Sequence, residues 1–323
     1  MKKLIALIIS LATLFSLVSC FEGINKESDH LNIGFMSGPT GMGMAKLIHD
    51  NGGLEGNDKY SFEGFTDSKL AVAALVSGKL DVICLPTNEA ATLYNANGKI
   101  QVLAINCLNS LYLLSNSQYS DGEINDFYDL DGKTIYTCKN GTPKIILDYL
   151  IEATGINATV LTSYDGKEIL SPADLGARVV VGGPELVVAP EPIVTSSLLK
   201  NSDYKVELDL DDAWSSVNDT PVTMGCIVAR AEFVKSNSNL INEFLGEYKA
   251  SIEFIGTKAN IDDAAAYVTE AGVMGAVGAA KKSLLNLGDA ISYLDGAEMK
   301  KALKVFYAAF GMDQPKDTFY YEK

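Results

Sequence analysis

A glycine-rich turn near the N-terminus is the first stretch whose residue types could bind a small molecule. In LNIGFMSGPTGMGMAKLI, residues 31–48, an apolar run ends at Met36, passes through SGPTG and continues into a helical pattern. A Walker phosphate loop requires four residues between two glycines and then Lys-Ser/Thr, and the dinucleotide motif requires glycine where Lys46 stands. Neither motif is present. The turn still precedes a helix N-terminus, whose unpaired N–H groups and positive dipole end favour a small polar or anionic group.

Groups that could act as nucleophiles, general bases or metal ligands are few. The only histidines are His30, just after the N-terminal segment, and His49, late in the first predicted helix, so neither lies at the carboxyl end of a strand. Four cysteines follow Cys20 without CxxC spacing, which argues against zinc and redox sites: Cys84, Cys107, Cys138 and Cys226. An exported location would permit a disulfide, but their apolar settings favour buried free thiols. We therefore expect no catalytic residue, no metal ion and no cofactor.

The first twenty residues predict export and a lipid anchor. Two lysines precede an uncharged apolar run over residues 4–17, which is too short to span a bilayer comfortably and is typical of a signal peptide over residues 1–19. The run ends in LVSC, which resembles a bacterial lipobox with Cys20 as the lipidated residue. Acyl chains contribute about 0.8 kcal/mol per buried methylene, so two or three of them tether a protein stably. The alternative is an ordinary signal peptide with a cysteine beside its cleavage site.

Charge and hydropathy argue against several partners. Removal of Lys2 and Lys3 with the signal peptide takes the formal net charge from −15 to −17, which disfavours nucleic acid and anionic membrane surfaces. No later apolar run is long and uninterrupted enough to be a transmembrane helix. The lipid on Cys20 is therefore the expected contact with the membrane, on the outer side of the bacterial cytoplasmic membrane.

Apolar β-type runs alternate with amphipathic helical stretches along the chain. This alternation is typical of the α/β class, with a mostly parallel sheet covered by helices. The first predicted strands cover residues 31–36, 60–65, 80–85 and 101–107. The predicted helices between them cover residues 41–50, 67–78 and 87–96.

From about residue 129 the same order begins again. Residues 133–137 form a predicted strand, Thr142 caps the next helix, Pro143 takes its first position, and Gly155 ends it. Residues 67–88 and 171–192 also align without a gap. In that alignment Gly78 falls on Gly182, Asp81 on Glu185, and Pro86 on Pro190.

The repeat predicts two lobes of similar construction. About 300 mature residues exceed one comfortable core, which also favours two lobes. The alternative is an accidental match between glycine-rich α/β segments. Because ligands bind at the carboxyl ends of the strands in open parallel sheets, the site is expected between the lobes.

These features together resemble a known family. The lipobox, the first strand with its Gly-Thr turn, KLAVAALVSGKLDVICLP, DLDGKTIYTCKNGTPKIILDYLIEATGI and VVAPEPIVTSSLL resemble solute-binding lipoproteins of ABC importers. The most similar group binds nitrate, sulfonates, taurine and thiamine precursors. The resemblance covers nearly the whole mature chain and rests on the order of the motifs. It implies the class II periplasmic-binding-protein fold, an α/β fold with two lobes, two crossovers and a ligand cleft that closes by hinge motion.

The resemblance also implies a domain organisation. Lobe 1 comprises residues 31–115 plus 225–323, lobe 2 comprises residues 116–224, and residues 20–30 form a linker after the acylated cysteine. The segment from Ser238 onward is largely helical, with LINEFLGEYKASIEFI and GAEMKKALKVFYAAFG as its clearest stretches. We expect this helical segment to pack on lobe 1.

The family's ligand loops correspond to the segments that follow the predicted strands. The ligand-binding residues that the resemblance implies are Ser37, Gly38, Pro39, Thr40, Gly41, Thr66, Asp67, Ser68, Pro86, Thr87, Asn88, Asn140, Gly141, Thr142 and Glu191. Glu191 lies in a Pro-Glu-Pro element similar to the family's second-lobe cleft edge, and it could contact a cationic or hydrogen-bond-donating group. The alternative is that many of these residues merely cap helices, as Ser, Thr, Asn and Asp do widely.

Composition also limits the ligand. Arg178 and Arg230 are the only arginines, so a bidentate clamp on an amino-acid carboxylate has few candidates. Helix N-termini and hydroxyls can hold a compact anionic or neutral polar group without arginine. The expected ligand is therefore a sulfonate, a carboxylate or a heterocycle such as a vitamin precursor. Four aromatic residues are candidates for stacking on a ring, unless they pack in a core: Tyr112, Tyr136, Tyr164 and Trp214.

The function that the resemblance implies is that of a transport receptor. It would act as a monomer, capture a small-molecule solute and deliver it to an ABC permease and its ATPase. Two other classes stay open. One is an enzyme, because pyrimidine-precursor synthases and a chorismate-processing lyase use the same fold, although the export signal and the few catalytic groups argue against it. The other is a surface adhesion or signalling lipoprotein that does not transport.

Overall fold

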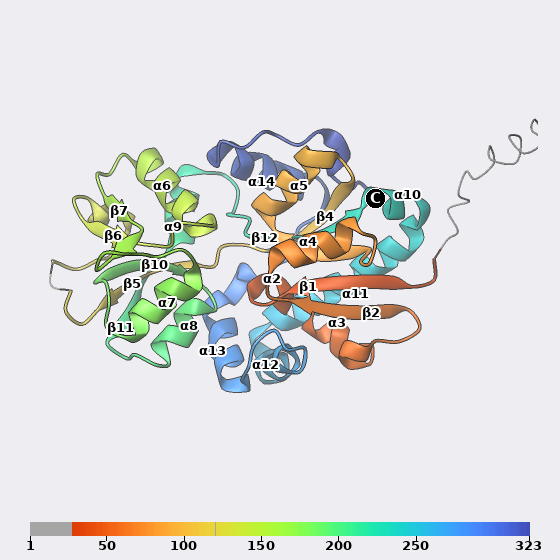
Figure 1. Cartoon of the computed structure of the whole chain (residues 1–323), viewed down its shortest axis with the longest axis horizontal. Coiled ribbons are helices and arrows are strands. Elements are labelled where there is room, and N and C mark those ends of the chain that lie inside the picture. Colours follow the sequence, from red (N-terminus) through yellow and green to blue (C-terminus); the bar gives the residue numbers. More distant parts are fainter. Residues whose placement is uncertain (1–27, 120) are drawn as a thin grey trace, which may run out of the picture.

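The computed structural model describes residues 28–119 and 121–323 and contains two lobes side by side (Figure 1). Each lobe is built on a five-stranded sheet covered by helices, so the predicted two-lobed α/β fold class is confirmed. The signal peptide and Cys20 lie outside the described residues. In the part of the chain that the structure describes, no helix combines the length and the apolar character needed to cross a bilayer.

The first-lobe sheet contains four of the predicted strands and one returning strand. Its strands are β1 (Leu31–Met36), β2 (Tyr60–Phe65), β3 (Val82–Pro86), β4 (Ile100–Cys107) and β12 (Gly225–Arg230), in the order β2-β1-β3-β12-β4. β1 is parallel to β2 and β3, whereas β12 is antiparallel to β3 and β4. The carboxyl ends of β1 to β4 and the start of β12 therefore share one edge of the sheet. The four predicted strands are confirmed, with small shifts at their ends.

The second-lobe sheet has the same arrangement. Its strands are β5 (Leu111–Asn116), β6 (Thr134–Tyr136), β7 (Thr159–Leu161), β10 (Leu186–Pro190) and β11 (Tyr204–Asp209), in the order β11-β5-β10-β6-β7. β10 and β7 are parallel to β6, and β5 is antiparallel to β10 and β11. The antiparallel strand again stands second from one edge. The short strands β8 (Ser163–Tyr164) and β9 (Lys167–Glu168) form a separate hairpin.

The lobes exchange one strand each through two crossovers. β5 belongs to the second sheet, although the predicted first lobe extends to residue 115; the apolar sequence around it contains no turn signal that would mark the change of lobe. We propose the crossovers at residues 108–110 and 218–224. The second crossover ends where the chain was predicted to return to the first lobe, at residue 225. Near the crossovers the two lobes share a continuous apolar core that includes Ile105, Leu111 and Trp214.

The first-lobe helices begin where the strands end. They are α2 (Pro39–Met42), α3 (Ala45–Asp50), α4 (Ser68–Val76) and α5 (Thr87–Asn97). The single helix predicted over residues 41–50 is wrong: it starts at Pro39, behind Gly38 with φ of +90°, and it is broken between Met42 and Ala45. The break brings Gly43 against Ile252, where a Cβ would lie 2.6 Å from the Ile252 side chain. Tertiary packing therefore overrides the helical pattern.

The second-lobe helices are α6 (Thr142–Thr154), α7 (Pro172–Val180), α8 (Ile193–Leu198) and α9 (Leu210–Val217). The predicted cap of α6 is wrong by one residue. The N-cap is Gly141, with φ of +100° and no side-chain hydrogen bond, so Thr142 is the first helical residue and Pro143 the second. Gly155 ends α6 in the left-handed conformation, as predicted.

The C-terminal segment is helical, as predicted. Its helices are α10 (Ala231–Ser236), α11 (Ser238–Gly256), α12 (Ile261–Glu270), α13 (Val277–Leu287) and α14 (Gly296–Ala309). Short 3₁₀ turns cover Gly53–Glu55, Phe127–Leu130, Lys258–Asn260, Gly288–Ala290 and Asp317–Phe319. α11 and α12 pack on the first lobe, where Phe244, Tyr248 and Val268 join the core of β1 and β2. α13 departs from the prediction, because it also contacts α8 of the second lobe (Figure 1).

Candidate functional site

Three of the predicted loops lie together at the first-lobe edge. Residues 37–41, 66–68 and 86–88 directly follow the carboxyl ends of β1, β2 and β3. Gly225, at the start of β12, pairs with both Pro86 and Cys107 and so marks the same edge. Ser68 Oγ donates to Glu89 Oε1 at 3.0 Å, which joins the second of these loops to the helix that follows the third.

The second-lobe residues lie at the corresponding edge of the other sheet. The loop of residues 140–142 follows β6, and Glu191 follows β10. Pro190 pairs with Leu111 at the start of β5, and Asp209, at the end of β11, pairs with Tyr112. The carboxyl ends of β6, β10 and β11 therefore share one edge, as do those of β1 to β4 in the first lobe.

Contacts across the crossovers show that the two edges face one another. A Cβ on Gly38 would lie 3.5 Å from Pro192 Cδ, so the first-lobe turn meets the second-lobe Pro-Glu-Pro element. Asn109, in the crossover, donates through Nδ2 to Asp209 Oδ1 at 2.5 Å. The loop of residues 140–142 makes no such contact with the first lobe among the described residues, because its neighbours are Cys138 and Pro143 of its own lobe.

A network behind the first turn holds Thr40 in place. Asn106 is buried and donates through Nδ2 to Thr40 O at 3.0 Å and to Tyr248 Oη at 2.8 Å. A Cβ on Gly225 would lie 2.2 Å from Thr40 Cγ2 and 2.7 Å from Asn106 Oδ1, so only glycine fits beside them. The sequence prediction missed Asn106, and the one available signal was a polar residue at the end of an apolar strand.

Several buried polar atoms at the first-lobe edge have no partner among the described residues. Thr87 Oγ1 and Asn88 Oδ1 follow β3, Asn106 Oδ1 is near the end of β4, and Thr223 Oγ1 comes just before β12. An unpaired buried polar group costs about 1–3 kcal/mol, so native proteins usually satisfy such groups. Four of the buried polar atoms that lack a partner among the described residues thus lie at this edge. Thr87 and Asn88 were predicted, whereas Thr223 was missed.

Glu191 is buried and already has protein partners. Its carboxylate accepts hydrogen bonds from Thr195 N at 3.3 Å, Thr195 Oγ1 at 2.9 Å, Ser283 Oγ at 3.1 Å and Asn286 Nδ2 at 2.8 Å. Burial raises the pKa of this carboxyl group, and the four hydrogen bonds oppose the rise. A ligand that contacts the Glu191 carboxylate would therefore compete with α8 and α13.

The second-lobe edge is acidic. Tyr112 is buried, and burial raises its pKa, with further contributions from the charges of Asp209, Glu191 and Asp211. Burial also raises the pKa of Asp209 and of Asp211. The two lysines that flank the loop of residues 140–142 are occupied, because Lys139 pairs with Glu168 and Lys144 with Asp148.

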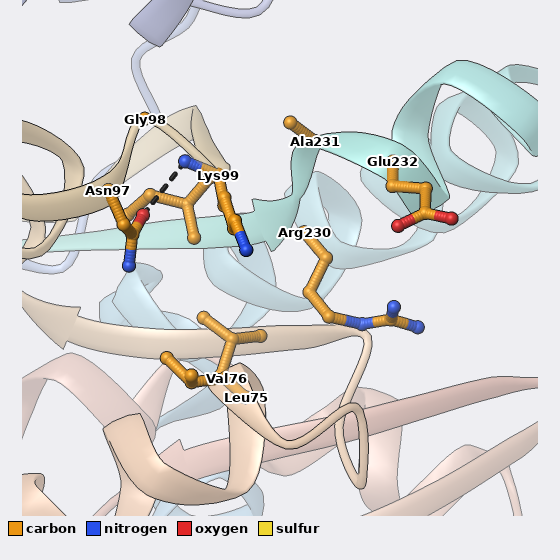
Figure 2. A pocket seen from close by; sticks show the side chains of 9 residues that line it. Leu75, Val76, Asn97, Gly98, Lys99, Arg230, Ala231 and Glu232 are labelled. Carbon is orange, nitrogen blue, oxygen red and sulfur yellow. Dashed lines mark hydrogen bonds between the residues drawn. The ribbon is translucent and has the colours of Figure 1, made fainter.

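Arg230 and most of the candidate aromatic residues have other roles. Arg230 ends β12, at the opposite edge, and pairs with buried Asp81 at 2.5 Å. It lines a hollow of about 370 Å³ with Leu75, Val76, residues 97–100, Ala231 and Glu232 (Figure 2). Trp214 is fully buried and donates to Thr220 O, whereas Tyr136 and Tyr164 pack edge to face. Tyr112, near the start of β5, and Tyr136, the last residue of β6, lie at the second-lobe facing edge.

The chemically reactive residue types lie away from the facing edges or are protonated. His30 Nδ1 contacts Asp58 O, and His49 Nδ1 contacts Glu270 Oε2 at 2.9 Å beside the stacked ring of Tyr267. The four described cysteines are free and buried. Burial raises the pKa of the Cys84 and Cys107 thiols to about 12 and that of Cys138 to about 11, and it also raises that of Cys226. Over the described ranges, no group of His, Cys, Asp and Glu gathers as metal ligands would.

Comparison with known proteins gives matches among solved structures. No protein-family model matches the chain, and no curated protein matches its sequence. An ABC transporter from Parabacteroides distasonis is 20% identical, with a TM-score of 0.72 over 92% of this chain and 100% of that one. The periplasmic aliphatic sulphonate binding protein SsuA from Escherichia coli is 17% identical, with a TM-score of 0.66 over 92% of this chain and 93% of that one. The chain has the periplasmic-binding-protein fold.

A third match extends the comparison to another ligand. The periplasmic nitrate-binding protein NrtA from Synechocystis PCC 6803 is 14% identical, with a TM-score of 0.57 over 88% of this chain and 81% of that one. The family resemblance inferred from the sequence motifs is confirmed at the level of the fold. In a periplasmic-binding-protein fold the two facing strand edges are the expected place for a ligand.

Proposed function

We propose that this chain is an extracytoplasmic solute-binding lipoprotein that captures a small organic ligand between its lobes and delivers it to an ABC importer. The observation that carries the proposal is the set of buried atoms at the first-lobe edge that have no partner among the described residues, Thr87 Oγ1, Asn88 Oδ1 and Thr223 Oγ1. This edge faces the second lobe, which the two proposed crossovers join to the first. Contacts from both lobes at once give a ligand the differential affinity that closure requires. A permease and its ATPase are the proposed partners, and a monomer is the proposed state.

Among the three expected ligand classes, we favour a heterocycle with N–H donors or a positive charge over a sulfonate or a carboxylate. The predicted loop residues contain no lysine or arginine, and the flanking Lys139 and Lys144 are paired with acids. The carboxylates of Glu191, Asp209 and Asp211 lie near Tyr112 at the facing edge. An anion placed there would meet like charges, whereas a protonated or N–H-rich ring would find acceptors in Asp209 and Asp211.

A ligand screen tests this proposal. Sulfonates, aromatic carboxylates, amino acids and aminated heterocycles are added in turn while the melting temperature is followed. A ligand at one hundred times its Kd stabilises the folded state by about 2.7 kcal/mol, which shifts the melting temperature measurably. We expect heterocycles alone to raise it. A response confined to sulfonates would overturn the ligand class, and a response to no small molecule would count against the receptor.

The lipid anchor on Cys20 is a separate part of the proposal. A Cys20→Ser chain is expected to leave the membrane fraction and to lose incorporation of labelled fatty acid, because the thioether has no other attachment point. Membrane retention of the Cys20→Ser chain with label still incorporated would contradict the anchor.

The enzyme alternative gains no candidate from the described residues. His30 and His49 lie away from the facing edges, and the four described thiols have raised pKa values. Turnover of a screened ligand would revive that alternative.

A further inference from the structure

Helix α13 belongs by its packing to the first lobe. Ala280, Leu284 and Leu287 are buried in a core built from β1, β2, α3, α11 and α12. These three residues follow the i, i+4, i+7 spacing of one helix face. No described residue of the second lobe takes part in that core, so this face fixes α13 to the first lobe.

The neighbouring face of α13 is bound to the second lobe. Ser283 is fully buried and donates to Glu191 Oε2 at 3.1 Å, and Asn286 Nδ2 donates to Glu191 Oε1 at 2.8 Å and to Thr195 Oγ1 at 3.0 Å. The backbone carbonyl of Asn286 accepts a hydrogen bond from Tyr112 Oη at 2.7 Å. Asn286 thus contacts β5, α8 and the loop between β10 and α8, and in Figure 1 α13 lies between α8 and α12.

The Glu191 carboxylate makes this contact strong and specific. Hydrogen bonds to a charged acceptor are about twice as strong as neutral ones. Glu191 is 3% exposed with α13 in place, and separating α13 from α8 would remove two of its four hydrogen bonds and leave only the donors of Thr195. The same contact adjoins the place where Gly38 meets Pro192, where the facing edges come together.

We propose that Ser283 and Asn286 of α13 form a latch with Glu191 that holds the two lobes at the separation seen in this structure, and that Asn286 is a positioning residue for ligand binding. The latch itself follows from the contacts, and only its effect on ligand affinity rests on the proposed function. A protein that is already partly closed binds its ligand more tightly, because the apparent Kd is the intrinsic Kd divided by the competent fraction. On this account Glu191 serves closure rather than ligand contact.

Distances between spin labels on the two lobes test the latch without any ligand. Leu54 of the first lobe and Val181 of the second are 46% and 79% exposed, and each is replaced by a labelled cysteine in the full chain carrying Cys20→Ser. The native described cysteines are buried and should stay unlabelled. Asn286→Asp places two carboxylates together, so the main distance should lengthen and broaden. The pair Glu191→Gln with Asn286→Asp restores a donor and an acceptor and should return the wild-type distance.

Matched variants separate the latch from a general loss of stability. Asn260→Ala removes an asparagine of the same helical segment whose Nδ2 donates within it, to Phe254 O at 3.1 Å, and it should leave the distance unchanged. Ser283→Ala is a milder latch variant for use if Asn286→Asp does not fold. A wild-type distance in Asn286→Asp and Ser283→Ala would overturn the latch, as would a failure of the double variant to restore it. A lengthened and restored distance in a protein that binds no screened solute would leave the latch standing and reject the receptor.

Discussion

The two lobes differ at one equivalent position, the residue after the proline that ends β3 in the first lobe and β10 in the second. In the first lobe that residue is Thr87, whose Oγ1 is buried with no partner among the residues that the structure describes. In the second lobe it is Glu191, whose carboxylate has four protein donors. The two sheets have the same strand order. The difference therefore lies in what the two residues do and not in where they stand in the fold. The first lobe keeps free polar atoms at its edge, whereas the second lobe uses the same position to bind the C-terminal helices.

The largest expected effect concerns the strand that enters each sheet from the other lobe. β12 begins with Gly225, whereas β5 begins with buried Leu111. Gly225→Ala would place a Cβ 2.2 Å from Thr40 Cγ2, and we expect the free energy of unfolding to fall by about 3 kcal/mol. Chemical denaturation measures it.

Gly246→Ala is the control for this substitution. Gly246 lies within α11, and its Cβ would meet nothing within 4 Å, so alanine should stabilise the protein by about 0.5–1 kcal/mol. A Gly225→Ala variant as stable as the Gly246→Ala control would show that the first-lobe edge is not tightly packed.

The next effect compares Glu191→Gln with Thr87→Val. The glutamine replaces a charged acceptor of four hydrogen bonds, so unfolding should become easier by about 2 kcal/mol. The valine removes a hydroxyl that has no described partner, so stability should change by less than about 1 kcal/mol while ligand affinity falls about tenfold, or 1.4 kcal/mol. Denaturation and ligand titration are measured on both variants. If Thr87→Val destabilised the protein more than Glu191→Gln, the proposed difference in role between the two positions would be wrong.

A smaller effect compares the two glycine turns. Neither Thr40 nor Thr142 caps its helix through a side chain, because Gly38 and Gly141 hold the N-cap positions. Thr40→Ala and Thr142→Ala should therefore each cost less than the roughly 1 kcal/mol of a lost cap. If both turns face the ligand, each variant weakens its binding in a titration. Unchanged affinity in Thr142→Ala alone would limit the site to the first lobe and the Pro-Glu-Pro element.

The smallest expected effect is on the reactivity of the four described thiols. Three of them lie in the first-lobe sheet, and Cys138 follows β6 of the second-lobe sheet. Burial raises the pKa of all four, to about 12 for Cys84 and Cys107 and about 11 for Cys138, so they are protonated and shielded near pH 7. In a Cys20→Ser chain, a thiol reagent should label none of them in the native state and all four in denaturant. Rapid native labelling of Cys138 alone would show that the second lobe is more open than the first.

Local patterns explain what the sequence could predict. The four strands of the first lobe and the glycines that follow helices depend on nearby residues, and so does the repeat that aligns Pro86 with Pro190. The break between α2 and α3 depends on Ile252 of α11, and two of the three partner residues of Glu191, Ser283 and Asn286, are more than ninety positions away. A single sequence contains no signal for such distant pairings, so the closing contacts of the candidate site were missed.

The central claim is that a small ligand binds between the facing edges, with contacts from both lobes. A crystal structure of the protein with the strongest compound from the thermal screen tests it most directly. We predict that the ligand lies within hydrogen-bond distance of at least one of Thr87, Asn88 and Thr223 and also touches the second-lobe edge. A ligand found in the hollow beside Arg230 (Figure 2), or bound to one lobe alone, would contradict the account.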